Sequence, residues 1–194
     1  MLDARLKVSR RELILGGQRS GKSRRAECLA QSWLGVSKTH NALLIATARA
    51  GDAEMRQRIE RHQADRARRV PRMHCVEEPL ALAQAIAAYS APQTLVLVDC
   101  LTLWLTNQLM PAEALVDPAD APTPEVALAA LLQALQQASG PVVLVSNEIG
   151  MGLIPMGREV RDFVDALGQL NQAVAGVCER VTLMAAGLPL ILKD

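Results

Sequence analysis

Aromatic residues are scarce in this sequence: two tryptophans, one tyrosine and one phenylalanine make up 2% of its 194 residues. None of the four lies in the most basic segment, so stacking of nucleic-acid bases on an aromatic platform is not indicated there. The chain also lacks an excess of charge, because 21 basic residues nearly balance 20 acidic ones and leave a formal net charge of +1. This balance gives no general reason to expect nucleic acid or an acidic membrane as a partner.

Paired cysteines are absent as well. The four cysteines are scattered and form no Cys-x-x-Cys pair: Cys28, Cys75, Cys100 and Cys178. Disulfide scaffolds and zinc ribbons cluster their cysteines, so we expect reduced thiols in a cytoplasmic protein. The three histidines show no ligand spacing either, which argues against a metal held only by protein side chains.

No uninterrupted hydrophobic run is long enough to span a membrane. Two stretches without charge, residues 79–98 and 126–147, are broken by turn or polar residues, YSAPQT in one and QQASGP in the other. Helix, turn and buried strand explain both stretches better than a membrane span does. The N-terminal segment MLDARLKVSRR is basic but has no apolar core after it, so we expect a frayed extension over residues 1–10 rather than a signal peptide.

Apolar, β-rich runs alternate with helical patterns along the chain. This alternation predicts an α/β fold with a mostly parallel central sheet and helices on both faces, in one domain over residues 1–194. The expected strands are 12–15, 42–46, 73–76, 94–98, 142–146, 180–184 and 190–192. The expected helices are 22–34, 53–69, 80–88, 101–109, 125–138 and 159–177. Residues 111–124, with four prolines and three acids, predict an exposed loop.

The stretch GGQRSGKS has the composition of a phosphate-binding loop. Gly16, Gly21, Lys22 and Ser23 match the pattern G-x-x-x-x-G-K-[ST], with a strand expected before it and a helix after it. Glycines let backbone N–H groups point at phosphate oxygens, and the helix start adds its positive dipole end. The Lys22 amine is placed to reach the β- and γ-phosphates, and the Ser23 hydroxyl to ligate Mg²⁺.

An acid at the end of a neighbouring strand would complete such a magnesium site. The segment TLVLVDC supplies Asp99 after four apolar residues, at the strand end that faces the ligand crevice of a parallel sheet. Asp99 could instead cap the helix that is expected from Leu101. Cys100 follows it in place of a glutamate that could activate water, which favours transfer to a substrate hydroxyl over a motor-type ATPase.

The segment DAEMRQRIERHQADRARR concentrates positive charge. Seven of the 21 basic residues lie within residues 56–72, and none follows until Arg158. On a helix, His62 then lies one turn from an arginine on either side, Arg58 and Arg66. The arginines could bind polyphosphate, and an uncharged imidazole beside them has a lone pair that can attack phosphorus.

Three other interpretations of this segment stay open from the residues alone. It could be a solvated basic helix with an incidental histidine. It could belong to a nucleic-acid-binding P-loop ATPase module that grips the backbone of a single strand. It could also belong to a regulatory nucleotide-binding protein that has no turnover.

Taken together, the motifs resemble the bifunctional adenosylcobinamide kinase/adenosylcobinamide-phosphate guanylyltransferases of cobalamin biosynthesis. The matching stretches run in order along almost the whole chain: GGQRSGKS, IATARAGDAEMRQRIERHQADR, VEEPLALA, LVDCLTLWLTN, VSNEIGMGLIP, the spaced pattern R-x-F-x-D-x-x-G-x-x-N-Q of residues 161–172, and AAGLPLILK. The resemblance implies a RecA-like P-loop fold and a homotrimer. It also implies two reactions: phosphorylation of the aminopropanol hydroxyl of adenosylcobinamide with ATP or GTP, then transfer of GMP from GTP to adenosylcobinamide phosphate.

The resemblance further implies roles for individual residues. His62 matches the histidine that carries GMP covalently in the family, and Lys22 is the second catalytic residue. The nucleotide, with Mg²⁺ held by Ser23 and Asp99, is expected to contact Gly16, Gly17, Gln18, Arg19, Ser20, Gly21, Lys22, Ser23, Thr47, Ala48, Arg49, Gln63, Ala64, Asp65, Arg66, Glu77 and Asp99. His40 and His74 are expected to be structural.

The segment VSNEIGMGLIP follows a buried strand, at the edge where ligands bind in such sheets. Gly150 and Gly152 permit conformations or close approaches that side chains would block. The segment could be a substrate-side loop or a purely structural turn. Trp104 with Asn107 could likewise help to shape the corrinoid site, or Trp104 could fill the core.

Overall fold

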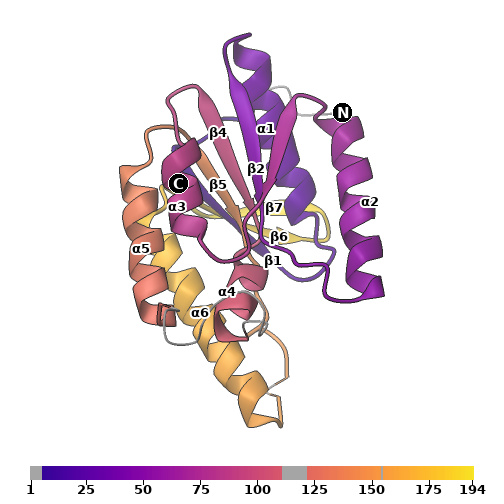
Figure 1. The fold of residues 1–194 in the computed structure, drawn as a ribbon, viewed down its shortest axis with the longest axis vertical. Helices are drawn as coiled ribbons and strands as arrows, with labels where there is room; N and C mark the ends of the chain where they lie inside the picture. Colours follow the sequence, from indigo (N-terminus) through magenta and orange to yellow (C-terminus); the bar gives the residue numbers. More distant parts are fainter. Residues whose placement is uncertain (1–5, 111–121, 154) are drawn as a thin grey trace.

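The computed structural model describes residues 6–110, 122–153 and 155–194 (Figure 1). In these ranges, seven strands form a single sheet in the order β3-β2-β4-β5-β1-β6-β7. The strands are β1 (Arg11–Gly16), β2 (Asn41–Ala46), β3 (Met73–Glu77), β4 (Thr94–Asp99), β5 (Val142–Val145), β6 (Arg180–Ala185) and β7 (Leu188–Lys193). All neighbouring pairs are parallel except β6 and β7, which form an antiparallel hairpin. The expected mostly parallel sheet is therefore confirmed.

Six helices in the described part of the chain cover both faces of this sheet. They are α1 (Lys22–Val36), α2 (Ala53–Arg69), α3 (Leu82–Tyr89), α4 (Leu101–Leu109), α5 (Pro124–Gln137) and α6 (Arg158–Val177). Helices α1 and α2 lie on one side of the sheet, and α3, α5 and α6 lie on the other (Figure 1). The α/β class with helices on both faces is thus as expected.

The strands are apolar on both faces because helices cover both. On β1, Leu13 packs into the core under α3, α5 and α6, whereas the adjacent Ile14 packs into the core under α1. Both side chains are completely buried. Alternation of this kind along a parallel strand produces a continuous hydrophobic run rather than a polar–apolar pattern.

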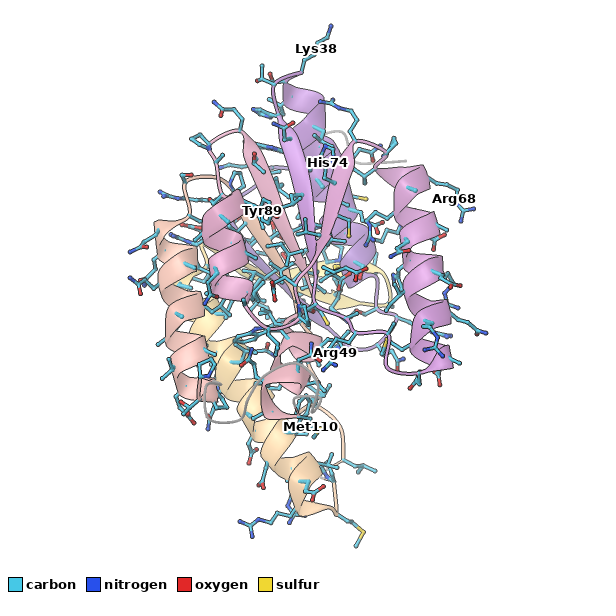
Figure 2. The ribbon with its side chains drawn as sticks, in the orientation of Figure 1. Lys38, Arg49, Arg68, His74, Tyr89 and Met110 are labelled. Carbon is cyan, nitrogen blue, oxygen red and sulfur yellow. The ribbon has the colours of Figure 1, made fainter. Side chains whose placement is uncertain are left out.

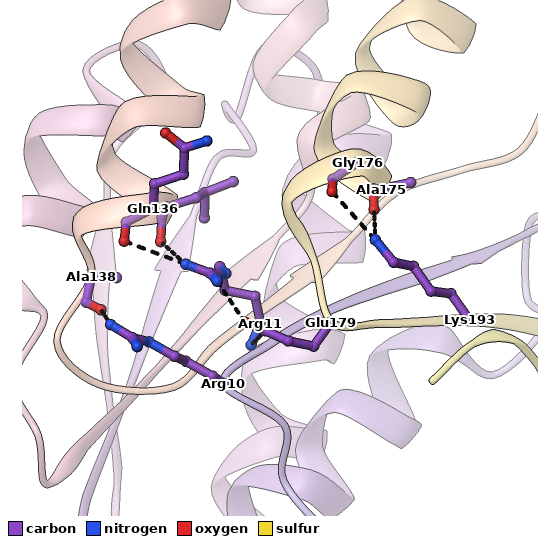
Figure 3. Close-up of polar contacts among 9 residues, drawn as sticks. Arg10, Arg11, Gln136, Ala138, Ala175, Gly176, Glu179 and Lys193 are labelled. Atoms are coloured by element: carbon purple, nitrogen blue, oxygen red, sulfur yellow. Dashed lines mark hydrogen bonds and ion pairs between the residues drawn. The ribbon is translucent and has the colours of Figure 1, made fainter.

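Basic side chains from outside the helices cap the C-terminal ends of α5 and α6, which have no basic residue in their own last turns. Arg11 donates to the carbonyl oxygens of Leu135 and Gln136 at 3.2 and 3.3 Å, and Arg10 donates to that of Ala138 (Figure 3). Lys193 of β7 donates to the carbonyl oxygens of Ala175 and Gly176 (Figure 3). Cations at these ends satisfy orphan carbonyl groups and oppose the negative end of the helix dipole.

The structure differs from the expected frayed N-terminal extension and from the expected loop 111–124. Residues 6–10 are not frayed: Leu6 and Val8 pack against the core under α1, and the Ser32 hydroxyl donates to the Leu6 carbonyl oxygen at 2.9 Å. Residues 1–5 and 111–121 lie outside the described residues. The expected loop 111–124 extends one residue too far, because α5 begins at Pro124 and Thr123 is its N-cap residue. None of the described helices is long and apolar enough to cross a membrane.

Candidate nucleotide site

The carboxyl ends of β1, β2, β4 and β5 meet at one edge of the sheet, where ligands bind in parallel α/β folds. Strand β1 leads into the phosphate-binding loop, β4 ends at Asp99 and β5 leads to Asn147. Because β5 lies between β1 and β4, one strand separates the phosphate-binding loop from the acid. All three segments therefore contribute to the same edge.

The backbone of the loop itself requires glycine at two positions. Gly16 has φ +150°, and a Cβ there would come within 2.5 Å of the Met184 carbonyl oxygen. Gly21, the N-cap of α1, has φ +101°. A side chain at either position would be strained, and at Gly16 it would also collide with β6. The pattern that identified this loop is thus dictated by its geometry.

The lysine of the loop is buried and held by the loop's own carbonyl groups. The Lys22 Nζ atom donates to the carbonyl oxygens of Gly16 and Gly17 at 2.9 and 2.6 Å. The turn of the β6–β7 hairpin supports the loop from outside, since the Gly187 N–H donates to the Ser20 carbonyl oxygen at 3.0 Å. The amine therefore lies beside the backbone groups that would surround a phosphate.

A cavity of about 570 Å³ opens above the loop, which is within the usual size range of small-molecule sites. It brings together much of the expected site: Gln18, Arg19, Ser20, Gly21, Lys22, Ser23, His62, Asp65 and Asp99. His62 is separated from the phosphate-binding loop by about forty positions in sequence, yet both line the same space. Asn147, which sequence placed only at the ligand edge, lines this cavity too.

A second, smaller hollow of about 100 Å³ adjoins it between α2 and the ends of β2, β3 and β4. Its lining contains further expected residues: Ser23, Ala48, His62, Gln63, Arg66, Glu77 and Asp99. Met55, Ile59 and Leu103 give it an apolar wall. His62, Ser23 and Asp99 line both spaces, so the imidazole lies where the two hollows meet.

Five of the expected contact residues line neither space: Gly16, Gly17, Thr47, Arg49 and Ala64. Gly16 and Gly17 act through the carbonyl groups that accept from Lys22. Thr47 is completely buried, and its hydroxyl donates to the Cys100 carbonyl oxygen at 2.7 Å while accepting from the Cys100 N–H at 2.9 Å. Arg49 lies at the carboxyl edge of the sheet (Figure 2).

Helix α2 presents two faces to the two hollows. Beyond the expected residues, the larger cavity is lined by Glu54, Gln57, Arg61 and Arg69, and also by Arg24 of α1. The expected nucleotide contacts on α2 did not include Glu54, Gln57, Arg61 and Arg69. These four could have been found from the same segment, because they recur with Asp65 at spacings of three or four residues, which is one face of a helix.

Charges on α2 are extensively paired. Arg69 Nη1 lies 2.8 Å from Glu27 Oε2 of α1, and this hydrogen bond raises the pKa of Arg69. A hydrogen bond from Arg68 lowers the pKa of Asp65 below its usual value, and Arg69 and His62 act in the same direction. Arg68 itself points away from the domain (Figure 2). The side chain of Arg58 lies outside the described part of the structure.

The oxygen ligands expected for Mg²⁺ fit such an ion in type. Ser23 and Asp99 line the same two hollows, and a hydroxyl and a carboxylate are hard ligands of the kind that Mg²⁺ prefers. In the described part of the chain, no group of three or more His, Cys, Asp or Glu side chains is placed to hold a metal ion. The donor set therefore suits an ion that keeps water and phosphate oxygens as its remaining ligands.

The remaining candidate residues lie elsewhere in the fold. The rings of His40 and Trp33 stack with centroids 3.8 Å apart, and His74 lies on β3 near its amino end (Figure 2). Trp104 is 2% exposed and fills the core, where its Nε1–H donates to the Leu80 carbonyl oxygen. Asn107 is also buried, and its side chain donates to the Thr47 carbonyl oxygen at 2.9 Å.

Known proteins share both the sequence and the fold. The sequence profile of the family described as "Cobinamide kinase / cobinamide phosphate guanyltransferase" matches residues 12–192. A bifunctional adenosylcobalamin biosynthesis protein, CobP, of Pseudomonas aeruginosa is 50% identical over 184 residues, which cover 94% of this chain and 97% of the relative. The corresponding protein CobU of Escherichia coli is 37% identical, over 93% of this chain and 98% of the relative.

Solved structures show the same fold at low identity. The flagellar accessory protein FlaH of Methanocaldococcus jannaschii has a TM-score of 0.52 with 12% identity, covering 99% of this chain and 81% of that one. A Pyrococcus horikoshii protein designated PH0250 has a TM-score of 0.51 with 9% identity, covering 97% and 88%. The family profile covers 181 positions, residues 12–192, and the chain belongs to the cobinamide kinase / cobinamide phosphate guanyltransferase family.

Proposed function

We propose that this chain performs both reactions of its family at the joined hollows, with His62 as the covalent carrier of GMP. Cobinamide kinase and cobinamide-phosphate guanylyltransferase activities are those of the family. One observation carries the proposal: His62 lines the same cavity as Lys22, Ser23 and Asp99. A nucleophile and a phosphate-binding loop in one space are what nucleotidyl transfer requires.

In the kinase reaction, the aminopropanol hydroxyl of adenosylcobinamide attacks the γ-phosphorus of ATP or GTP. A bond forms between the hydroxyl oxygen and phosphorus, the bond from phosphorus to the β–γ bridging oxygen breaks, and the hydroxyl proton leaves to solvent through the open cavity. Lys22 and the loop N–H groups hold the triphosphate and stabilise the charge on the departing diphosphate. Mg²⁺ bound by Ser23 and Asp99 would supply further positive charge to the β- and γ-phosphates.

In the guanylyl reaction, an imidazole nitrogen of His62 attacks the α-phosphorus of GTP. A phosphorus–nitrogen bond forms, the bond to the α–β bridging oxygen breaks, and pyrophosphate leaves. A phosphate oxygen of adenosylcobinamide phosphate then attacks the same phosphorus, breaks the phosphorus–nitrogen bond and gives adenosylcobinamide-GDP. Arg61 lines the cavity beside His62, where a cation stabilises a leaving pyrophosphate.

The smaller hollow suits the guanosine part of GTP. Its apolar wall of Met55, Ile59 and Leu103 can pack on a base, and Glu77 and Gln63 offer hydrogen-bonding groups. A carboxylate such as Glu77 can accept the two N–H groups of a guanine edge, which adenine lacks. This arrangement supports GTP as the donor in the guanylyl step.

The pairing of charges on α2 supports a small-molecule partner over nucleic acid. Arg69 is engaged by Glu27 and Arg68 by Asp65, so fewer free cations remain for a phosphate backbone than the sequence suggests. The alternative, a nucleic-acid-binding P-loop module, requires single-strand binding that weakens steeply with salt. Binding that is absent or insensitive to salt would eliminate that alternative.

The exposed face of β7 supports a homotrimer, and the state of the cysteines supports a cytoplasmic location. The edge strand β7 exposes Leu188, Leu190, Ile191 and Leu192, and an apolar edge strand is a site where another chain can add. All four cysteines are free, as expected in a reducing compartment.

The proposal is tested with GTP that is labelled separately at the α- and γ-positions. We expect the α-label to remain on denatured wild-type protein, to be released by acid, and to be absent from His62→Ala. The γ-label should appear on adenosylcobinamide in both proteins. Retention of full guanylyl transfer by His62→Ala would refute the covalent mechanism.

A further inference from the structure

We propose that a groove between α6 and residues 149–153 and 155 binds the corrin macrocycle of adenosylcobinamide, which assumes the function proposed above. This corrin groove has a volume of about 640 Å³ and includes Ile149, Leu153, Pro155, Gly168, Gln169 and Gln172 in its lining. It shares no lining residue with either nucleotide hollow. It therefore offers space for a second substrate beside the nucleotide.

The groove begins where the phosphate cavity ends. Asn147 lines the phosphate cavity and Ile149, two residues later, lines the groove, so their Cα atoms lie at most about 7.6 Å apart. Between them, the Glu148 N–H donates to the Gly16 carbonyl oxygen at 3.1 Å. A macrocycle in the groove would therefore have its flexible aminopropanol arm directed past Asn147 to the phosphate-binding loop.

Helix α6 is fixed to this junction by a buried amide. Asn171 is 4% exposed, and its Nδ2 donates to the Asn147 carbonyl oxygen at 3.0 Å. At the other end of the loop, the Arg161 guanidinium donates to the carbonyl oxygens of Pro155, at 3.0 Å, and Met156. Both ends of the segment are thus tied to the helix that forms the opposite wall.

The two walls differ in chemistry in a way that matches a corrin. The loop wall is apolar, because Ile149, Leu153 and Pro155 line it, and Leu153 is 98% exposed. Met151 and Met156 of the same segment are also exposed, although they lie outside the lining. Large apolar side chains gathered in one exposed segment mark a site of interaction. The helix wall carries Gln169 and Gln172, whose amide groups can donate to and accept from the acetamide and propionamide arms around a corrin ring.

Charge is consistent with this occupant. The corrin of adenosylcobinamide is cationic, and Asp165 lines the groove with an exposed side chain. The guanidinium of Arg161, the cation in the lining, is turned to the loop carbonyl groups. A phosphate-bearing ligand would find no comparable set of donors there, which separates this groove from the nucleotide site.

Two glycines of α6 provide a matched pair of variants. A Cβ at Gly168 would meet nothing within 4 Å, and the same is true at Gly176, but only Gly168 lines the groove. Leucine favours helix over glycine by about 1 kcal/mol, so both substitutions should preserve the fold. Gly168→Leu would place a bulky side chain on the floor of the groove, whereas Gly176→Leu would not.

The test is equilibrium dialysis with adenosylcobinamide, followed by the visible absorbance of the corrin. We expect Gly168→Leu to raise the Kd at least about tenfold and Gly176→Leu to leave it within about twofold. The double variant Gln169→Leu/Gln172→Leu, which adds no bulk, should raise the Kd by about tenfold through lost amide hydrogen bonds. Incorporation of GMP from GTP without corrinoid should be unchanged in all three.

Wild-type affinity in both Gly168→Leu and the glutamine variant would overturn the proposal. A change in oligomeric state on sedimentation, with an unchanged Kd for corrinoid, would also overturn it and assign the groove to contact with a second copy of the chain. Failure of the proposed function has a different signature, because wild-type protein would then bind corrinoid but never acquire GMP.

Discussion

Replacing Thr47 with valine should lower the free energy of unfolding by about 1 to 3 kcal/mol, although the two side chains have nearly the same shape. The Thr47 hydroxyl accepts from the Cys100 N–H and donates to the Cys100 carbonyl oxygen, and Thr47 is completely buried. In the variant the N–H loses this partner in a buried place, at a cost of roughly 1–3 kcal/mol. The Cys100 carbonyl oxygen still accepts from the Trp104 backbone N–H at 3.1 Å, so losing its bond to the Thr47 hydroxyl costs only about 1 kcal/mol.

One term opposes these losses, because the variant no longer buries a hydroxyl, which returns about 1 kcal/mol. The matched control is Thr47→Ser, which keeps both hydrogen bonds, loses one methyl group and should cost about 1 kcal/mol. Urea unfolding of both variants measures the difference. The lost hydroxyl holds the backbone of Cys100, the residue directly after Asp99, so we expect the valine variant to misplace Asp99 and lose kinase turnover as well. Equal stability of the two variants would refute the interpretation of Thr47 as a brace between β2 and β4.

Three further predictions concern the loop lysine, the thiols and the helix caps. Lys22→Met should lower the kinase kcat by about 10²–10³-fold with an unchanged far-UV circular dichroism spectrum, because the positive charge that Lys22 provides to the triphosphate is lost. Unchanged turnover would contradict the role of the loop. Burial raises the pKa of Cys100 from 9.0 to about 11, so the buried neutral thiol contributes fully to the free energy of unfolding below about pH 9, and this contribution is lost as pH rises toward 11. The urea midpoint of the wild-type protein should therefore fall over this range, and it should fall less in Cys100→Ala. Lys193→Met should cost about 1 kcal/mol because two carbonyl groups of α6 lose their donor, whereas Lys38→Met, at a side chain that projects into solvent (Figure 2), should cost nothing measurable; equal effects in urea unfolding would count against the cap.

The features that sequence predicted well are local. The phosphate-binding loop can be recognised from sequence because Gly16 and Gly21 adopt positive φ, and this backbone conformation is set by the chain within a few residues. Strand positions followed from continuous apolar runs, since a sheet covered on both faces demands them. His62 was singled out by its arginine neighbours and by the family resemblance. Its role stays a prediction, and the structure adds that it lines the same cavity as the loop.

The features that sequence missed depend on contacts between distant residues. Thr47 matched a nucleotide contact, yet its hydroxyl binds Cys100, and this pairing arises only because β2 lies beside β4. Lys193 could not be assigned to the end of α6 before β7 was placed next to β6. Residues 6–10 looked like a frayed end because their attachment depends on α1, which carries the hydroxyl of Ser32.

The central claim is that the side chain of His62 takes up the nucleotidyl group of GTP bound at the joined hollows. Intact-mass measurement after incubation with GTP and Mg²⁺, without corrinoid, tests it most directly. We expect wild-type protein to gain the mass of one GMP residue, to lose it when adenosylcobinamide phosphate is added, and to carry it on the peptide that contains His62. A wild-type protein that completes the reaction without ever gaining that mass would contradict the account, as would His62→Ala gaining it in full.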